Sequence, residues 1–594
     1  MSKRCWKALS VIFLALGMLG LALLTTRAAG GGYTEWSTDT FPDFCQGTMN
    51  GVDVWSDPGT ARLDRNWYPN VRVNDVSSQS KLAPSLTFAL TGTGGTTETV
   101  FLAVWVDERA CDHCGDIYFA RGTNHGRTWS PDVNLYDECD PDGPPYPAPC
   151  CPCPHDPDIA MRVADESLWA VWWEDWSDED YEPTRDDGDI HYLTSSNWKG
   201  PLASITTYTG TVYAGTGKQL LPRIAAHGAS GYLYTVWEDE RSDDGDIYIS
   251  RYNPDVDLAW STPVKVSDDT TGAEQREPNL AVDADGNVYA VWEDLRENDN
   301  GEIYFSRWIS GTWGTGTWSA NARLSDPTMD WANGPDIVTR PGGVLFAAWK
   351  ERVPTGPATY DFQIVVARSG NRGDTWSRLV EHRLYNASAS NAFYASPAIG
   401  VSPLGRVYVA WLHSPDSQAS TSNVLFSLSP DGGMHWTQPR VLSWPAGTVD
   451  VDTVPALASD FEGQIVVAWQ DFREGSSTQI YATGYPADHY LTSGKYARIF
   501  DGGPAAWGHI TWTATITPGT GLVLATRVMT TAGAGWTEWF THTASGEAIP
   551  HPAGRFIQYR AVFTSSGNDT SVLDKVIISY EQYRIFLPVV LKGA

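Results

Sequence analysis

The sequence is poor in positive charge. Its 594 residues include 41 lysines and arginines against 71 aspartates and glutamates, and the net charge is −30. No cluster of lysine and arginine forms the basic face that a nucleic-acid-binding protein needs. The composition therefore excludes nucleic acid as a partner. An acidic surface is typical of an extracellular protein that its charge keeps soluble, or of one that binds divalent cations.

Helical periodicity is also scarce. Beyond the first 30 residues, no long stretch repeats apolar side chains at the spacing of a helix face. The 28 tryptophans, 26 tyrosines, 55 glycines and 37 prolines are typical of many short strands joined by tight turns. These features predict an all-β protein.

Long apolar runs are missing except at the N-terminus. Three basic residues precede an apolar run at 8–24, and Thr26–Ala28 resembles the approach to a cleavage site. We therefore predict a signal peptide at residues 1–29 and a secreted, extracellular or cell-surface protein. The mature chain would contain no membrane span unless this segment is retained as an anchor.

Cysteine is limited to eight residues, and six of them fall within one stretch of the chain. These six are Cys111, Cys114, Cys139, Cys150, Cys151 and Cys153. Export to an oxidising compartment favours disulfide bonds among them. A zinc site that combines these thiols with His113 or His155 is the alternative, because the first pair has zinc-type spacing.

An internal repeat organises the middle of the chain. A proline followed two residues later by leucine or isoleucine recurs at Pro84, Pro157, Pro222, Pro278, Pro335, Pro397 and Pro455. An apolar strand then ends in a tryptophan each time: Trp105, Trp172, Trp237, Trp292, Trp349, Trp411 and Trp469. Each unit contains four predicted strands, and seven such units predict a seven-bladed β-propeller at 70–487.

The seventh unit lacks its fourth strand. The segment 70–75 matches the fourth-strand pattern and precedes the first unit, so we predict that it completes the last blade and closes the ring. Residues 30–69 are then an N-terminal extension. After the repeat stops, alternating strands at 488–582 predict a small β-sandwich, followed by a short tail at 583–594.

Three tryptophans of this C-terminal module, Trp507, Trp536 and Trp539, are candidates for a sugar-binding platform. The alternative is that they pack in its core, because large aromatic side chains dominate protein interiors.

The turns before several fourth strands carry a signature. Residues 369–376 read Ser-Gly-Asn-Arg-Gly-Asp-Thr-Trp, and 122–129 and 429–436 are close variants. This matches the Asp-box, and the chain resembles the sialidase-like Asp-box (BNR-repeat) propellers over about 70–487. The resemblance implies a glycan-related propeller, and the C-terminal module similarly resembles carbohydrate-binding modules.

The chain departs from true sialidases in two respects. Those enzymes have six blades, whereas seven repeats are present here. They also carry Arg-Ile-Pro on the first blade as part of an arginine triad, whereas residues 82–86 here read Leu-Ala-Pro-Ser-Leu. These departures weigh against hydrolysis of sialic acid.

Recurrence separates structural from functional candidates. Trp-x-Asp-x-Arg occurs in four blades, with Asp107/Arg109, Asp239/Arg241, Asp294/Arg296 and Asp471/Arg473. A catalytic group should break a repeat rather than follow it. We therefore predict that these pairs cap a turn or form an ion pair after the second strand.

The candidate site residues break the repeat on one face of the propeller. That face carries the loops from the fourth strand of one blade to the first strand of the next (four–one loops) and the loops from the second to the third strand (two–three loops). The candidate catalytic residues are Arg223, Glu277, Asp336 and Tyr394, and the candidate ligand-binding residues are Asp158, Arg276, Asp330 and Trp331. Paired carboxylates perform acid/base hydrolysis of glycans, and tyrosine is the nucleophile of sialidases. The alternative for each is an ordinary loop residue.

Three functions remain open on the sequence. The first is a secreted or cell-surface propeller that binds an extracellular glycan or glycoprotein. The second is a glycoside hydrolase or polysaccharide lyase, and the third is an adhesion or structural scaffold. No cofactor is expected. The acidic loops at 178–189, 243–246 and 297–302 would suit calcium, and the alternative is that they are solvated acidic loops without a bound ion.

Overall fold

A computed structural model describes most of the chain. The described residues are 34–38, 48–50, 52–53, 61–63, 67–76, 79–91, 98–109, 115–137, 153–175, 188–242, 245–297, 300–309, 313, 318–329, 331–356, 359–378, 393–394, 396–403, 405–414, 422–437, 439–444, 448–450, 453–460, 463–486, 493–531, 534–566 and 569–582. The predicted signal peptide and C-terminal tail lie outside these residues. Among them, no helix has the length and apolar character needed to cross a membrane.

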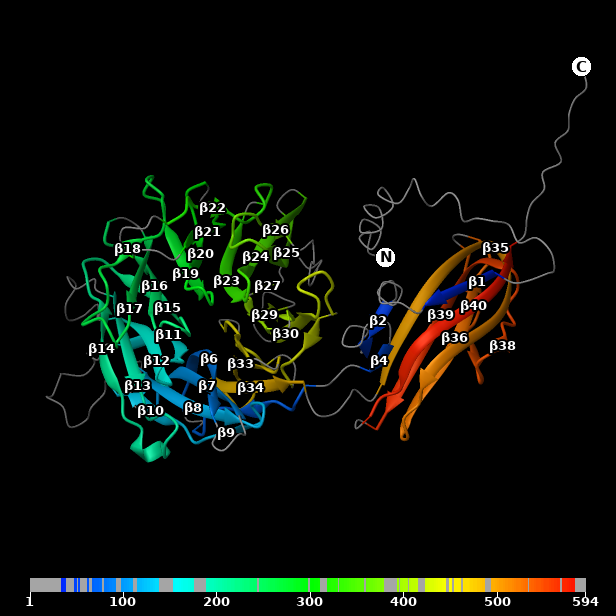
Figure 1. Cartoon of the computed structure of the whole chain (residues 1–594), viewed down its shortest axis with the longest axis horizontal. Helices are drawn as coiled ribbons and strands as arrows, with labels where there is room; N and C mark the ends of the chain where they lie inside the picture. Colours follow the sequence, from blue (N-terminus) through cyan, green and yellow to red (C-terminus); the bar gives the residue numbers. More distant parts are fainter. Residues whose placement is uncertain are drawn as a thin grey trace, which may run out of the picture. The chain divides into compact units, whose positions relative to one another are not determined.

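Residues 67–486 form a seven-bladed β-propeller, as predicted. Each blade is an antiparallel sheet whose strands follow one another outward from the centre (Figure 1). Blades one to three consist of β6 (Lys81–Thr91), β7 (Glu98–Asp107), β8 (Asp116–Thr123), β9 (Thr128–Trp129) and β10 (Val133–Tyr136); β11 (Cys153–Arg162), β12 (Ser167–Asp175), β13 (Gly188–Ser195) and β14 (Tyr208–Tyr213); and β15 (Gln219–Ala226), β16 (Leu233–Asp239), β17 (Asp246–Tyr252) and β18 (Val264–Lys265).

Blades four to seven repeat this order. They consist of β19 (Gln275–Val282), β20 (Val288–Asp294), β21 (Glu302–Trp308) and β22 (Ala322–Arg323); β23 (Ala332–Arg340), β24 (Val344–Gly356), β25 (Thr359–Ser369) and β26 (Ser377–Arg378); β27 (Phe393–Tyr394), β28 (Ala398–Val401), β29 (Val407–Ser414), β30 (Asn423–Ser429) and β31 (Arg440–Val441); and β32 (Ala456–Ser459), β33 (Ile465–Asp471), β34 (Gln479–Tyr485) and β5 (Val71–Arg72).

The ring closes with a strand from the front of the chain. Val71 and Arg72 of β5 pair with Ala482 and Tyr481 of β34, which confirms the closing role predicted for 70–75. Inner strands of adjacent blades contact one another around the circle, and β32 of blade seven contacts β6 of blade one. Closure therefore pairs the outer edge of β34 and completes the seventh blade.

The repeated tryptophans are the largest fully buried side chains of the propeller. In six of the seven blades the indole Nε1 donates to the carboxylate two residues later, as from Trp292 to Asp294 at 2.9 Å. In the four Trp-x-Asp-x-Arg blades, that carboxylate also accepts from the arginine's backbone N–H and guanidinium. The recurring Asp/Arg pairs therefore cap a turn and form ion pairs, as predicted.

The turns between third and fourth strands are closed by side chains. Asn371 Oδ1 accepts from Thr375 N at 3.0 Å, and Asp431 Oδ1 accepts from His435 N at 2.9 Å. Gly373 has a φ of +84°, and a Cβ at this position would lie 2.3 Å from the Phe305 ring of the preceding blade. Glycine is therefore required where this turn meets the neighbouring sheet.

A second unit combines both ends of the described chain. Its ten-stranded sheet contains β35 (Ser493–Thr515), β36 (Thr520–Met529), β37 (Phe540–His542), β38 (Glu547–Ala548), β39 (Gly554–Ser565) and β40 (Val572–Gln582), together with β1 (Thr34–Thr38), β2 (Thr48–Asn50), β3 (Val52–Asp53) and β4 (Ala61–Leu63). The long strand β35 pairs with β39 through residues 493–505 and with β40 through 505–515, so the sheet folds over one core.

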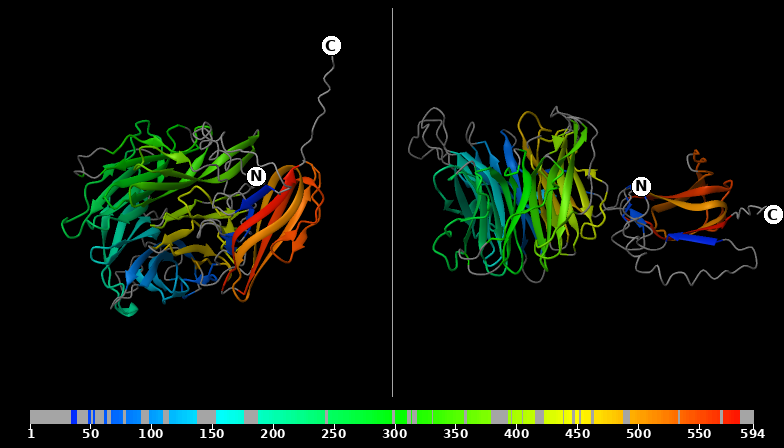
Figure 2. Two further views of the ribbon diagram at one scale, coloured as in Figure 1. Left: turned by 45° about the vertical axis from the view of Figure 1, so that its right-hand side comes forward. Right: turned by 90° about the horizontal axis from the view of Figure 1, so that it is seen from above.

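The N-terminal extension is thus part of the C-terminal module. β1 pairs with β40 over its full length, β2 pairs with β35, and β4 pairs with β40 (Figure 2). The sequence-based boundaries separated 30–69 from 488–582, and only strand pairing reveals that they share a sheet. The propeller begins at Trp67 and ends at Pro486, between these two parts.

Candidate functional site

A β-bulge precedes the repeat proline in the inner strand of each of the first five blades. The register shifts there, and the residue before the proline has positive φ: Ala83, Asp156, Leu221, Glu277 and Gly334. A bulge inserts one residue and redirects its side chain. Glu277 consequently reaches the next blade, where its Oε2 accepts from Gly334 N at 3.1 Å.

The position after the repeat proline connects neighbouring blades across the channel wall. Asp158 accepts from Ser85 Oγ of blade one at 2.7 Å and from Ile224 N of blade three at 2.8 Å. Asp336 likewise accepts from Asn279 Nδ2 of blade four at 2.8 Å and from Ile399 N of blade six at 2.8 Å. Both carboxylates therefore hold three consecutive blades together.

Arg223 occupies the same position, directly after the repeat proline, in blade three. Burial raises the pKa of Asp336 to about 6; the Ile399 and Ile337 N–H groups and the charge of Arg223 oppose the rise, and Asp158 adds to it. The structure thus places Asp158, Arg223 and Asp336 in one electrostatic neighbourhood. Because backbone N–H groups already engage both carboxylates, their contacts indicate a positioning role, and a catalytic role for this set stays a prediction.

Arg276 and Glu277 lie in a different cluster at the start of β19. The Arg276 guanidinium binds Glu293 of β20 in bidentate fashion, with Nε and Nη2 each 3.0 Å from a carboxylate oxygen. Its Nη1 donates to Glu274 at 3.1 Å. Arg276 and Glu274 keep 34% and 31% of their side chains exposed, so they lie between solvent and the fully buried Glu293.

Three buried ionisable side chains form the floor of this cluster. Glu238 of blade three, Glu293 of blade four and Lys350 of blade five each follow the repeat tryptophan directly, and each is at most 5% exposed. They share the edge of the sheets where four–one loops enter and two–three loops leave. This is the face that the sequence predicted for ligand binding.

Burial shifts all three pKa values toward neutrality. It raises the pKa of Glu238 to about 8, and the negative charges of Glu274 and Glu240 add to the effect. It raises the pKa of Glu293 to about 7, against the opposing effect of Arg276. It lowers the pKa of Lys350 to about 8, although Glu277 and Glu293 favour the charged form.

These shifts give the cluster proton donors and acceptors at physiological pH. At pH 7 the carboxyl group of Glu238 is mostly protonated, because its pKa is about 8. The pKa of Glu293 is about 7 and that of Lys350 is about 8, so both of these groups also titrate near neutral pH. Groups that exchange protons near the working pH are the most effective general acids and bases. Shifted pKa values produced by burial and specific partners concentrate at functional sites.

An aromatic pair borders the cluster. The ammonium of Lys350 lies 4.6 Å from the ring centroid of Trp331, and Trp331 meets Phe362 edge-on at 5.6 Å. Trp331 is partly exposed, so part of its surface remains available to a ligand. Among the remaining candidates, Tyr394 lies in β27 opposite His413, and Asp330 lies outside the described residues.

Sequence reasoning missed Glu238, Glu293 and Lys350, although a signal for them was present. The position after the repeat tryptophan holds Val106, Trp173, Leu412 and Gln470 in the other blades. Ionisable residues in three consecutive blades therefore break the repeat, which is the criterion for a functional group stated above.

The cysteine and calcium predictions remain mostly untested. Cys153 begins β11 and is disulfide-bonded, whereas Cys111, Cys114, Cys139, Cys150 and Cys151 lie outside the described residues. Most of the acidic loop 178–189, and parts of the other two loops, also lie outside them. Within the residues that can be described, no group of three or more His, Cys, Asp or Glu side chains is arranged to hold a metal ion.

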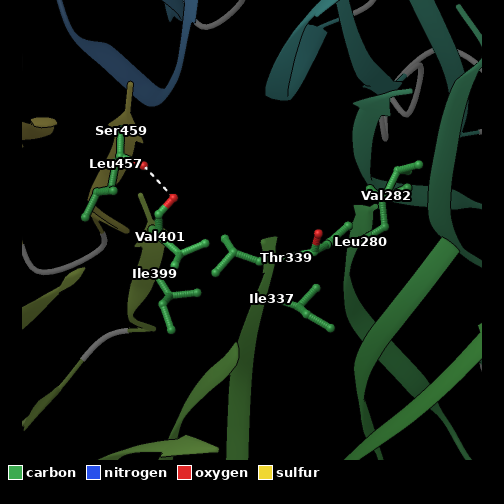
Figure 3. A pocket seen from close by; sticks show the side chains of 11 residues that line it. Leu280, Val282, Ile337, Thr339, Ile399, Val401, Leu457 and Ser459 are labelled. Atoms are coloured by element: carbon green, nitrogen blue, oxygen red, sulfur yellow. Dashed lines mark hydrogen bonds between the residues drawn. The ribbon is translucent and has the colours of Figure 1, made fainter. Parts of the chain in front are cut away.

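A cavity of about 270 Å³ opens in the propeller channel, away from this cluster. Figure 3 shows the inner strands of blades four to seven directing aliphatic side chains into it, with Thr339 and Ser459 as its polar members. Ser459 Oγ donates to Val401 O at 3.4 Å. No titratable side chain lines this cavity, and its polar side chains are the hydroxyls of Thr339 and Ser459.

No family model matches the chain, and no curated protein matches its sequence. Solved structures with a similar fold include an ulvan lyase, at 12% identity and a TM-score of 0.45 over 70% of this chain and 95% of the lyase. An α-L-arabinanase from Penicillium chrysogenum in complex with arabinobiose is 16% identical, with a TM-score of 0.37 over 56% of this chain and 94% of its own. A sialidase from Trypanosoma rangeli in complex with sialic acid is 11% identical, with a TM-score of 0.35 over 88% and 96%.

Proposed function

We propose that the propeller binds an extracellular glycan on the face formed by Trp331, Arg276 and the side chains around them. The observation that carries this proposal is the partly exposed Trp331 beside a charged rim over a floor of buried ionisable side chains. Glycan recognition combines an aromatic surface for the sugar ring with directed hydrogen bonds to its hydroxyl groups. Arg276 and Glu274 supply both donors and acceptors at this rim.

A second candidate function is cleavage of that glycan, as a glycoside hydrolase or a polysaccharide lyase. It is favoured by the pKa values of Glu238, Glu293 and Lys350, which burial moves toward neutrality. A hydrolase needs one protonated and one ionised carboxyl group at the scissile bond. A lyase needs a base that removes a proton next to a carboxylate, and a lysine with a lowered pKa suits that role.

We further propose that the protein is exported and that the cysteines between 111 and 153 form disulfide bonds with one another. The basic and apolar N-terminus supports export, and the disulfide at Cys153 supports an oxidising compartment. A sialidase-like Asp-box propeller is the family to which the turns at 122–129, 369–376 and 429–436 point. The absence of Arg-Ile-Pro on blade one favours a substrate other than a sialoside.

A glycan array followed by turnover assays tests both functions. In the Trp331→Ala variant, affinity for the glycan should fall about tenfold, because the aromatic contact is lost. In the Glu293→Gln variant, any cleavage should be abolished while binding persists. New reducing ends without unsaturated product identify a hydrolase, and unsaturated uronate absorbance identifies a lyase.

The matched control is Glu297→Gln, an acidic residue on the same face of blade four that binds Arg323 and lies outside the cluster. Binding and turnover should both be unchanged in it. Affinity that survives Trp331→Ala would overturn the proposed binding surface, and cleavage that survives Glu293→Gln would overturn the proposed acid/base role.

The buried carboxyl of Glu238 makes a separate prediction about pH and stability. Its pKa rises from 4.5 to about 8, so between these values the folded state retains a proton that the unfolded state releases. The stability contributed by the protonated form is complete below about pH 4.5 and is lost as pH rises through 8. The urea midpoint should therefore fall between pH 5 and 8, and this fall should be smaller in Glu238→Gln.

Glutamine mimics the neutral carboxyl group without titrating. The Asp268→Asn variant, which alters an exposed carboxylate in the loop between blades three and four, should keep the pH dependence of the unmodified protein. Identical slopes in Glu238→Gln and the unmodified protein would show that Glu238 ionises at its ordinary pKa.

A further inference from the structure

Two arginines lie side by side on the outer face of the second unit. Arg527 of β36 and Arg560 of β39 occupy adjacent strands, where Arg527 pairs with Gln558 and Arg560 pairs with Ala525. The alternate residues Thr526, Val528 and Tyr559 are buried and face the core. Arg527, Gln558 and Arg560 therefore project together from the opposite face of the sheet.

Tryptophans from the segment after β36 cover both guanidinium groups. Arg527 Cζ lies 4.8 Å from the Trp536 ring centroid and 4.5 Å from that of Trp539. Arg560 Cζ lies 4.3 Å from the same Trp539 ring. Thr537, between the two tryptophans, holds the segment in place because its backbone N–H donates to Val528 O at 2.9 Å.

Trp507, in contrast, packs in the core of the unit at 6% exposure. Of the three tryptophans considered as a sugar platform, only Trp536 and Trp539 therefore lie outside the core and beside charged groups. Stacking on an indole engages the flat face of a guanidinium and leaves the N–H groups at its edges for hydrogen bonds.

These edges find no carboxylate among the described residues. Arg527 Nε donates to Gln558 Oε1 at 2.8 Å, and Arg560 Nε is buried without a hydrogen-bond partner in the described part of the chain. Glu538, the acidic residue of the covering segment, is exposed and forms no ion pair with either arginine. Elsewhere arginines such as Arg109, Arg296 and Arg555 face carboxylates.

Two neighbouring cations without a counterion are unfavourable in the unliganded protein. Burial lowers the pKa of Arg527, and the charge of Arg560 lowers it further. The protein has a net charge of −30, so a local concentration of positive charge is an exception on its surface. An anionic ligand would relieve this repulsion and would satisfy the free N–H groups at the same time.

We propose that Arg527, Arg560, Gln558, Trp536 and Trp539 form a binding site for an acidic polysaccharide whose sugar rings carry carboxylates. The guanidinium edges bind the uronate carboxylate, Gln558 binds a ring hydroxyl, and the tryptophans contact the sugar face. The site belongs to the second unit and does not depend on what the propeller binds. A neutral glycan would leave the two positive charges uncompensated.

The test uses the full chain and two matched probes. One is a hexamer of galacturonic acid, and the other is the same hexamer with its carboxylates reduced to primary alcohols. Calorimetry should show binding of the acidic hexamer, weakening as salt is added, and no binding of the reduced hexamer. Tryptophan fluorescence should change on binding because Trp536 and Trp539 contact the ligand.

The Arg560→Gln variant should bind the acidic hexamer about tenfold or more weakly, because a charge-assisted bidentate contact is lost. Arg555→Gln is the control, since Arg555 lies on the same sheet but is paired with Asp501 at 2.9 Å. Its affinity should be unchanged, and equal unfolding midpoints for both variants would exclude a folding defect. The Trp331→Ala variant should bind the hexamer as the unmodified protein does.

Three results would overturn the proposal. The first is no binding of the acidic hexamer, and the second is equal binding of the reduced one. The third is unchanged affinity in Arg560→Gln. Loss of hexamer binding in Trp331→Ala, but not in Arg560→Gln, would place uronate recognition on the propeller instead.

Discussion

Replacing Asp294 with alanine is expected to lower the free energy of unfolding by about 3–5 kcal/mol, the cost of removing one partner of a buried ion pair. Asp294 is fully buried and accepts from Trp292 Nε1 at 2.9 Å, from Arg296 N at 3.0 Å and from Arg296 Nε at 2.9 Å. The alanine variant leaves the indole and guanidinium donors without this acceptor. Urea unfolding followed by tryptophan fluorescence measures the change.

Asp268 provides a control on the same arginine. It binds Arg296 Nη1 at 2.6 Å but is 47% exposed, so Asp268→Ala should cost less than about 1 kcal/mol. Equal losses in the two variants would mean that the ion pair itself, rather than the buried indole–carboxylate–arginine arrangement, stabilises the blade. Blade six has His413 at the equivalent position, so the arrangement is not required in every blade.

Loss of the Asn74 side chain should open the ring where its two ends meet. Asn74 is buried, its Oδ1 accepts from Ile480 N at 2.9 Å, and its Nδ2 donates to Gln479 Oε1 at 2.7 Å. Asn74→Ala leaves these groups of blade seven unsatisfied, and we expect a loss of about 2–3 kcal/mol in the free energy of unfolding. The exposed edge of β34 should also increase aggregation, measurable by light scattering.

Arg72→Ala is the control for this prediction. Arg72 lies on the same closing strand and forms a partly exposed ion pair with Glu474 at 2.7 Å, so its loss should cost less than about 1 kcal/mol. If Asn74→Ala unfolds at the same urea concentration as the unmodified protein, closure does not depend on this side chain. Hydrogen exchange at the Val73 N–H, which donates to Ile480 O at 2.8 Å, would then show whether the closing segment remains paired with β34.

The blades could be predicted because each is specified by residues close together in sequence. A proline with an apolar residue two positions later, an apolar strand and a terminal tryptophan recur seven times, and each unit exposes apolar faces that only its neighbours can cover. Ring closure by 70–75 followed from the same reasoning, since the seventh unit lacked one strand. The recurrence of the Asp/Arg pairs also indicated their structural role correctly.

The chemistry of the candidate site depends on contacts between blades. Glu238 and Glu277 are 39 residues apart in the numbering, yet the Glu277 N–H and the nearby acidic side chains set the environment of Glu238. The bulge before the repeat proline turns Glu277 toward Gly334 of the next blade. A local sequence pattern does not predict such a contact between residues of two different blades. Burial then shifts the pKa values, and burial is a property of the packed ring.

The sequence by itself determined the class of fold, the number of blades and the strand that closes the ring, because local spacing and a missing strand carry that information. Tertiary structure alone decided that Glu238, Glu293 and Lys350 share one buried floor. It also placed strands from 34–63 in the sheet of 493–582, and set Arg527 and Arg560 against the same indole. Each of these arrangements depends on which surfaces of the folded chain pack together. The register between strands far apart in the sequence determines that packing.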